Sequence, residues 1–367
     1  MKVALVYDRV NKWGGAERVL LALHKIFPDA PLYTSVYDKK HALWAKVFRV
    51  KTTFLQKIPF AKNHHDLLAP LMPIAFETFN FDAYDVVISV TSEAAKGIVT
   101  KPGTLHICIS LTPTRYLWSG YDDYFKNKVL RFVATPVVWL LRKWDFAAAQ
   151  RPDAYIAISK EVARRVQKFY KKTASVIYPP IGLEKKRLPK LQHNDYFLIV
   201  SRLVPYKRID IAIEACNSLQ LPLKIVGTGS QEQYLKSIAG KTVEFVGRLT
   251  DDELIKYYNN CCAFLFPGLE DLGLTVLEAQ QYGKPVIAYK AGGAKETIIE
   301  GKTGEFFTPQ TSGALTKKLQ MLVKKRKIRL GSTKKNPYYT YCLKNAKQFN
   351  QAKFKKELVA FIKKQTI

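Results

Sequence analysis

The sequence is poor in cysteine, poor in acidic side chains and free of long apolar runs. Its five cysteines are an odd number without Cys-x-x-Cys spacing, which indicates buried, reduced thiols and excludes a disulfide framework. The longest apolar run, residues 132–141, has ten residues and contains Pro136, so it is too short to cross a bilayer. Met1 and Lys2 lead directly into a strand-like run, so we expect no signal peptide and a cytoplasmic location.

The shortage of acidic residues leaves the chain strongly basic. Lys and Arg number 59 and Asp and Glu number 30, for a formal net charge of +29. Such a field favours anionic partners, which include nucleic acid, anionic lipid and phosphorylated substrates. No zinc-finger, RRM or KH signature appears, so we expect no nucleic-acid partner. The adjacent His64 and His65 have no cysteine or second histidine pair nearby at ligand spacing, so we expect no metal site.

One stretch, Tyr121–Lys143, combines positive charge with aromatic and apolar side chains. Its cations are Lys126, Lys128, Arg131, Arg142 and Lys143. A segment of this kind suits an interfacial surface on an anionic membrane, which predicts a peripheral protein at the inner face of the plasma membrane. The alternative interpretation is a core helix with solvated basic side chains, and the sequence leaves both open.

In the second half of the chain, buried-strand patterns alternate with helical ones. The strand-like runs are Tyr196–Val200, Leu223–Val226, Val243–Val246, Ala263–Phe266 and Pro285–Tyr289. Asp251 is expected to be the N-cap of one intervening helix. This alternation predicts βαβ units and a parallel sheet, in which ligands bind at the carboxyl ends of the strands.

The loops after the first two of these runs carry cations and glycines. Arg202 and Lys207 lie on the first loop, where a planar guanidinium and an ammonium point charge can neutralise a diphosphate. Gly227 and Gly229 end the second run, and a glycine pair there allows a ligand to approach the backbone closely.

Two carboxylates, Glu270 and Glu278, bracket a turn that contains Gly273. We expect Glu270 on a loop after a strand and Glu278 early on the next helix. Free backbone N–H groups near Gly273, Leu274 and Thr275 would then face an anion, and both carboxylates could reach sugar hydroxyls. The alternative is a loop glutamate with a helix glutamate that faces solvent.

Taken together, these motifs resemble glycosyltransferase family 4. The second half contributes Ser201-Arg202-Leu203 with Lys207, Gly227-x-Gly229, Gly247-Arg248, the Glu270 and Glu278 pair, and Gly292-Gly293. The first half contributes Gly14-Gly15-Ala16-Glu17-Arg18-Val19, Thr112-Pro113-x-Arg115-Tyr116-x-Trp118, and Val176-Ile177-Tyr178-Pro179-Pro180 near an expected hinge. The resemblance spans essentially the whole chain and is nearest to mannosyltransferase-like members that build bacterial surface polysaccharides.

The resemblance implies an α/β fold of the GT-B type, with two Rossmann-like domains whose parallel sheets face an interdomain cleft. Residues 1–182 would form an acceptor-binding domain and residues 183–345 a nucleotide-sugar-binding domain. Residues 346–367 would form a helix that crosses back to the first domain.

The implied reaction is a retaining, metal-independent transfer of a hexosyl unit, with mannose favoured. The donor would be a nucleoside diphosphate sugar, GDP-mannose by preference, and the acceptor a saccharide or lipid-linked saccharide. No cofactor is expected. By the resemblance, Arg202 and Lys207 would stabilise the leaving diphosphate, and Glu270 would orient the donor sugar.

The remaining positions carry binding roles by the same resemblance. Glu278 would accept hydrogen bonds from the ribose, Arg248 would border the base, and the backbone of Gly273, Leu274 and Thr275 would orient the sugar. Gly227, Gly229, Gly14 and Gly15 would border the donor, and Arg115 and Tyr116 would lie on the acceptor side.

Two positions depart from the family's pattern. Leu111 stands where relatives usually carry a histidine before Thr-Pro, and Ser119 stands where an aspartate often follows the tryptophan. In relatives that histidine is thought to contact the reacting sugar. The departure therefore leaves two interpretations open: a lineage variant with another group in that place, or a catalytically weakened protein that binds a sugar or nucleotide.

Overall fold

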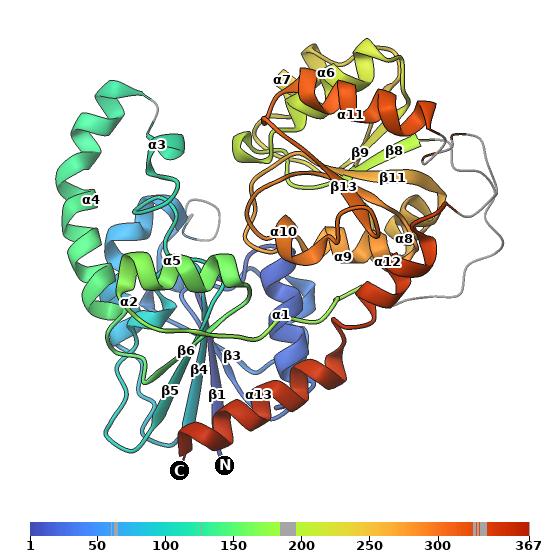
Figure 1. Ribbon diagram of the computed structural model, residues 1–367. Helices are drawn as coiled ribbons and strands as arrows, with labels where there is room; N and C mark the ends of the chain where they lie inside the picture. Colours follow the sequence, from blue (N-terminus) through green and yellow to red (C-terminus); the bar gives the residue numbers. More distant parts are fainter. Residues whose placement is uncertain are drawn as a thin grey trace. The chain divides into compact units, whose positions relative to one another are not determined.

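The computed structural model describes residues 1–59, 61, 65–125, 127–183, 196–325, 328, 330 and 336–366. The chain forms two compact units, Met1–Gly182 with Gln351–Ile367, and Leu183–Asn350 (Figure 1). Each unit is built around a sheet whose paired strands are all parallel throughout the described ranges. The predicted α/β fold with two Rossmann-like units is therefore confirmed.

The first sheet has seven strands in the order β3-β2-β1-β4-β5-β6-β7. Strand β1 (Val3–Tyr7) lies inside this sheet, between β2 and β4, and is buried along its whole length, which explains why it reads as a continuous apolar run. The other strands are β2 (Leu32–Thr34), β3 (Val50–Thr52), β4 (Val86–Thr91), β5 (Leu105–Ser110), β6 (Ala154–Ala157) and β7 (Ser175–Val176).

The helices of the first unit connect these strands, except the C-terminal helix, which follows the second unit in the sequence. They are α1 (Gly15–His24), α2 (Met72–Glu77), α3 (Tyr121–Tyr124), α4 (Lys128–Ala148), α5 (Lys160–Tyr170) and α13 (Gln351–Thr366), with the 3-10 turns η1 (Leu43–Val47), η2 (Phe54–Lys57), η3 (His65–Leu71) and η4 (Ala95–Gly97). The basic and aromatic stretch of the sequence becomes the short α3 and the long α4, and Lys126 lies outside the described residues.

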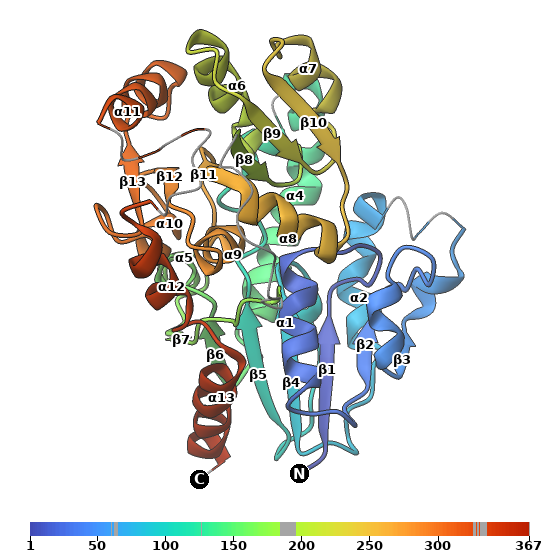
Figure 2. The same cartoon turned by 90° about the vertical axis from the view of Figure 1, so that its right-hand side faces the viewer.

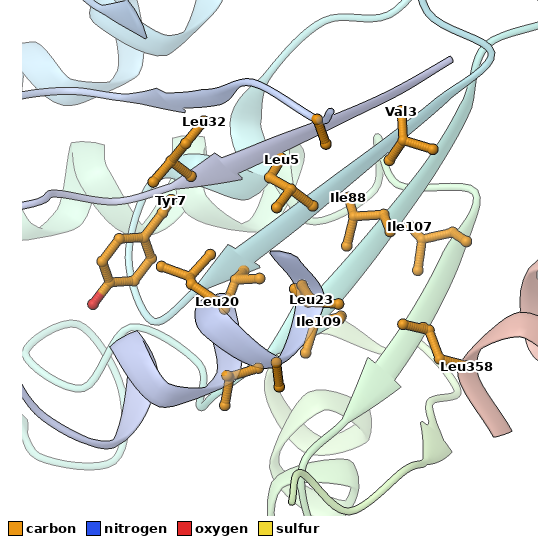
Figure 3. Packing of buried hydrophobic residues seen from close by; sticks show 14 of the residues in the cluster. Val3, Leu5, Tyr7, Leu20, Leu23, Leu32, Ile88, Ile107, Ile109 and Leu358 are labelled. Atoms are coloured by element: carbon orange, nitrogen blue, oxygen red, sulfur yellow. The ribbon is translucent and has the colours of Figure 1, made fainter. Parts of the chain in front are cut away.

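The core of the first unit lies between its sheet and α1. Leu20 and Leu23 of α1 point toward Leu5 of β1 and Ile88 of β4, as Figure 3 shows. The C-terminal helix α13 belongs to this core because Leu358 joins it with two residues on the same helical face, Phe354 and Ile362. The last helix therefore packs on the first unit although the chain reaches it from the second.

The second sheet has six strands in the order β10-β9-β8-β11-β12-β13 (Figure 2). These are β8 (Tyr196–Val200), β9 (Leu223–Val226), β10 (Val243–Gly247), β11 (Cys261–Phe266), β12 (Val286–Tyr289) and β13 (Gly304–Phe307). The connections are η5 (Pro205–Lys207), α6 (Ile209–Ser218), α7 (Glu232–Ser237), α8 (Asp251–Asn260), α9 (Leu274–Gln281), α10 (Ala294–Thr297), α11 (Ser312–Lys324) and α12 (Tyr339–Ala346).

The predicted cap of α8 is wrong by one residue. Thr250, not Asp251, is the N-cap: its hydroxyl accepts a hydrogen bond from the Glu253 N–H, and the Glu253 carboxylate accepts one from the Thr250 N–H. This reciprocal capping box satisfies two backbone donors, whereas an aspartate cap alone satisfies fewer. Asp251 is the first helical residue, where its negative charge favours the positive end of the helix dipole.

Candidate functional site

The second sheet has a topological switch point between β8 and β11. The chain runs outward from β8 to β9 and β10, then returns to add β11, β12 and β13 on the other side. The loops after β8 and β11 therefore leave the sheet in opposite directions, and in open parallel sheets the ligand site lies in the crevice between two such loops.

Three of the predicted residues lie on these two loops. Arg202 and Lys207 follow β8 and Glu270 follows β11. Lys207 and Glu270 form an ion pair, and their side chains are only 12% and 19% exposed. The guanidinium of Arg202 is exposed and donates a hydrogen bond to the Tyr206 hydroxyl at 2.8 Å. The structure thus brings the predicted phosphate-binding lysine and the predicted sugar-orienting carboxylate into contact.

A small cavity of about 10 Å³ lies beneath this ion pair. Both charged partners line it, together with Ser201 and the apolar ends of β8 and β11. Such a volume holds about one water molecule. The pair therefore borders the strand ends directly, with mostly apolar side chains below it.

Glycines set the distance between the loops after β8 and β9. A β-carbon on Gly227, whose φ is +131°, would lie 1.9 Å from the Ser201 carbonyl oxygen. A β-carbon on Gly229 would lie 2.3 Å from the Leu203 carbonyl oxygen. Both glycines are thus required by the packing of the loop that carries Arg202, a reason that the sequence interpretation did not include.

The loop after β12 supports Glu270 from the other side. The Gly293 N–H donates a hydrogen bond to the Glu270 carbonyl oxygen at 2.9 Å. A β-carbon on Gly292 would lie 2.4 Å from the same oxygen. The Gly-Gly pair therefore holds the backbone of the loop that presents the Glu270 carboxylate.

Helix α9 begins at the end of that loop. Gly273 precedes it with φ +83°, and its N-cap residue makes no side-chain capping bond. Leu274 and Thr275 are the first two helical residues. Glu278 is on the same helix but is 3% exposed and accepts a hydrogen bond from the Tyr258 hydroxyl at 2.9 Å. The alternative that Glu278 faces solvent is therefore wrong.

Arg248 lies apart from the ion pair. It is exposed on the loop after β10, and β10 is two strands away from β8. With strands spaced about 4.8 Å apart, this loop lies about 10 Å from the end of β8. Such a separation is compatible with contact to a distant part of an extended ligand.

The first sheet has an equivalent switch point between β1 and β4. Gly14 and Gly15 lie on the β1 side, where Gly15 opens α1. The loop after β4 is held there by Asp8, whose buried carboxylate accepts hydrogen bonds from the Thr91 hydroxyl and the Ala95 N–H. Burial raises the pKa of Asp8. The two loops at this switch point are therefore joined by a buried carboxylate that the sequence interpretation did not single out.

An ion pair crosses the same switch point. The Arg9 guanidinium contacts the Glu93 carboxylate. Burial favours the neutral form of Arg9, but the attraction of Glu93 outweighs it and holds the pKa of Arg9 above its ordinary value. Sequence reasoning missed these residues, although polar side chains directly after the buried runs of β1 and β4 signal them.

The predicted acceptor-side loop follows β5. Thr114 and Trp118 donate hydrogen bonds to the two carboxylate oxygens of Asp145 in α4, at 2.8 and 2.7 Å. Lys96 pairs with the same carboxylate at 2.6 Å, and both of those side chains are at most 2% exposed. Arg115 and Tyr116 lie on this loop, and burial raises the pKa of Tyr116. A buried ion pair thus holds the segment that presents them.

The two positions that depart from the family's pattern have different surroundings. Leu111 belongs to the apolar core of the first unit, whereas Ser119 is exposed. Leu111 therefore contributes packing and no polar atom at the end of β5.

Within the described ranges, no group of three or more histidine, cysteine, aspartate or glutamate side chains is arranged to hold a metal ion, and His64 lies outside them. The helices in the same ranges include none with the length and apolar character that a membrane crossing requires.

Residues 181–340, which contain the Lys207 and Glu270 pair, match the family model of glycosyl transferases group 1. The matched segment is therefore a group 1 glycosyltransferase domain. It covers the second unit almost entirely and includes both switch-point loops described above.

Several curated proteins are similar to this chain. An uncharacterized glycosyltransferase of Methanocaldococcus jannaschii is 27% identical over 187 residues, which are 50% of this chain and 53% of that protein. The D-rhamnosyltransferase WbpZ of Pseudomonas aeruginosa is 28% identical over 55% of this chain and 56% of its own. The O-antigen chain mannosyltransferase C of Escherichia coli is 27% identical over 55% and 57%. The chain thus spans little more than half the length of these relatives.

The fold of this chain also matches solved structures along almost its whole length. The structure of Anabaena HepE in complex with UDP aligns with a TM-score of 0.72 at 20% identity, covering 99% of this chain and 100% of that one. At this identity the likeness concerns the fold, and it assigns the two parallel sheets to the GT-B class.

Proposed function

We propose that this chain transfers a hexosyl unit from a nucleoside diphosphate sugar to a saccharide or lipid-linked saccharide in surface polysaccharide or glycolipid synthesis. One observation carries the proposal: the switch point of a group 1 glycosyltransferase domain presents two cations, Arg202 and Lys207, beside the Glu270 carboxylate. Cations in this position suit a diphosphate leaving group, and a carboxylate beside them suits sugar hydroxyls.

The proposed chemistry follows from these charges. When the bond between the sugar and the diphosphate breaks, negative charge grows on the diphosphate, and Arg202 and Lys207 stabilise it without a metal ion. Glu270 exchanges part of its attraction to Lys207 for hydrogen bonds to the sugar. Retention of the anomeric configuration is part of the proposal, and the one-bond coupling between C1 and H1 of the product measures it.

The proposed donor is GDP-mannose. A relative named as an O-antigen chain mannosyltransferase supports mannose, while the structural neighbour solved with UDP keeps UDP-sugars as the competing donors.

Glu278 in α9 is the proposed ribose contact, and Arg248 borders the base. The acceptor is proposed to contact the first unit at the loop that carries Arg115 and Tyr116, and the protein to act at the inner face of the plasma membrane.

The test is a panel of GDP-, UDP- and ADP-sugars, measured first by thermal shift and then by release of the free nucleotide. A ligand that binds only the folded state raises the melting temperature, by an amount that grows with the logarithm of its concentration relative to its Kd. We expect GDP-mannose to give the largest shift and slow nucleotide release that an acceptor extract accelerates. A panel without any shift contradicts the proposal.

A second candidate function rests on Leu111. Because an apolar core residue occupies the position where the family's pattern has histidine, the chain is alternatively a catalytically weakened protein that binds a nucleotide sugar. A clear thermal shift with one nucleotide sugar, without nucleotide release in the presence of acceptors, favours this candidate over the transferase.

A further inference from the structure

Helix α4 (Lys128–Ala148) exposes an apolar face. Val129, Phe132, Val133, Val137 and Leu140 repeat at helical spacing and lie on one side of the helix. Phe132 is 82% exposed, Val129 73% and Leu140 62%. Trp139 is also exposed, so the apolar side chains form a continuous stripe over about three turns.

The opposite face of α4 is buried in the first unit. Val138 and Leu141 pack in a cluster with Leu117, and Asp145 accepts the hydrogen bonds of the acceptor-side loop. Arg142 donates to the Leu117 carbonyl oxygen at 2.6 Å. The helix is therefore already packed on one side, and the apolar residues on its other side do not take part in the core of this unit.

Basic side chains flank the exposed stripe. The helix sequence contains Lys128, Arg131, Arg142 and Lys143, and its single carboxylate, Asp145, is buried against Lys96. The Lys143 ammonium lies 3.6 Å from the centre of the Trp139 ring. Arg131 reaches Asp122 at 3.1 Å, but both side chains are exposed, so this surface pair is weak. An apolar stripe with cations at its edges suits the boundary between headgroups and acyl chains.

We propose that the exposed face of α4 binds the surface of an anionic membrane and lies in its plane. Charge decides between a lipid surface and a second copy of the chain as the occupant of this face. Two copies with a net charge of +29 each repel one another, whereas anionic lipids attract the same charge. No segment of α4 spans the bilayer under this proposal, because its inward face remains packed on the protein.

This surface lies one helix away from the acceptor-side loop. The loop is held by Asp145 and Arg142 on the inward face of α4, and a helix with its side chains is about 10 Å across. A membrane on the outward face therefore brings the headgroup region close to Arg115 and Tyr116. If the proposed function holds, on which this step rests, the acceptor is lipid-linked.

The experiment is flotation of the full chain with vesicles. Vesicles of phosphatidylcholine with phosphatidylglycerol are compared with vesicles of phosphatidylcholine alone, at about 0.01 M and about 0.15 M salt, over which the screening length falls from about 30 Å to about 8 Å. We expect binding to the anionic vesicles that weakens with salt. Binding that is the same to both lipid compositions contradicts the proposal.

Substitutions separate the apolar and basic contributions. The variant V129S, F132S and L140S removes only exposed side chains, and we expect its affinity for anionic vesicles to fall at least about tenfold. The variant K128Q, R131Q and K143Q should lose the salt dependence. Arg142 is left in place because it also holds Leu117.

The control changes three large exposed residues of the second unit. Tyr234, Ile299 and Tyr341 are 50%, 46% and 51% exposed, and Y234S, I299S and Y341S should float as the unchanged protein does. Circular dichroism and thermal melting confirm that each variant is folded. A wild-type chain that fails to float at low salt overturns the proposal, as does an apolar variant that floats normally.

Light scattering tests the competing occupant. One outcome assigns the face to a second copy and overturns the lipid proposal. In that outcome the wild-type chain is a dimer that does not bind vesicles, and the variant V129S, F132S and L140S is a monomer. Turnover is measured separately with a water-soluble nucleotide-sugar donor. Loss of flotation with intact nucleotide binding distinguishes failure of this surface from failure of the proposed function.

Discussion

The ammonium group of Lys207 and the carboxylate of Glu270 form an ion pair that joins the loop after β8 to the loop after β11. Both side chains are mostly buried, so their attraction is less screened than that of an exposed pair. The pair holds together, at the ends of two neighbouring strands, the two charges that the proposed reaction needs. It also keeps each charge compensated before a substrate binds.

The two cations of the loop after β8 should each be important for turnover. We expect R202A and K207A to lower the turnover number by about 10²–10³, the effect of removing one preorganised charge donor. Nucleotide release under saturating donor measures this. K236A is the control because Lys236 pairs with Glu232 on the exposed helix α7. Rates near wild type in both R202A and K207A show that the diphosphate lies elsewhere.

Transfer should continue in the presence of a chelator. Arg202 and Lys207 supply the positive charge that a divalent ion provides in metal-dependent transferases, so we expect at most about a twofold change with excess EDTA. The assay follows product formation with and without EDTA, then with added magnesium or manganese. Activity that disappears with EDTA and returns with either metal refutes a purely cationic site.

Glu278 should affect donor affinity more than the chemical step. A contact to the ribose is equal in the ground and transition states, so E278Q should raise the donor KM by about 10-fold or more while kcat changes little. Y258F is the control: it removes the hydrogen bond that Glu278 accepts but leaves the carboxylate in place. An E278Q protein with the wild-type KM for the donor excludes the ribose assignment.

The buried pair of Lys96 and Asp145 should be coupled to the acceptor-side loop. D145A leaves the Lys96 ammonium buried without its carboxylate, which should lower the free energy of unfolding by about 3–5 kcal/mol. The double variant K96M and D145L should recover only part of this, because Thr114 and Trp118 lose their acceptor. Denaturant unfolding of the single and double variants gives the coupling energy. A full recovery in the double variant means that the loop does not depend on Asp145.

Stability should fall in acid partly because of His106. Burial, with the nearby charge of Arg151, lowers the pKa of His106 from 6.5 to about 3. Below pH 6.5 the unfolded chain takes up a proton that the folded chain does not, so the folded state loses up to about 1.4 kcal/mol per pH unit as the pH falls through this window.

The variant H106Q removes this titration and keeps a polar group near Ser89, whose hydroxyl lies 2.8 Å from the His106 Nε2. Unfolding free energies between neutral pH and about pH 4.5 should fall less steeply in H106Q than in the unchanged protein. Equal slopes mean that His106 is protonated in the folded state or is not buried in solution.

Much of the fold was readable from local patterns. The run Tyr196–Val200 and the run Leu223–Val226 are strands with the predicted bounds, and the α/β class follows from their alternation with helices. The short strands β2, β3 and β7 were not predicted, because runs of two or three residues show no periodicity. Thr250 was missed as a cap although Thr250-x-x-Glu253 is the sequence signature of a capping box.

The sequence by itself determined which residues follow which strand, and therefore that Arg202, Lys207 and Glu270 lie on loops at the carboxyl edge of a parallel sheet. Only the tertiary structure decided that β8 and β11 are neighbours, because strand order depends on long-range pairing that local patterns do not encode. For the same reason the contact between Lys207 and Glu270 was not predictable. In α4, apolar residues occur on all sides of the helix, so periodicity leaves its inner face undefined. The packing of Val138, Leu141 and Asp145 selects that face and leaves Phe132 and its neighbours exposed.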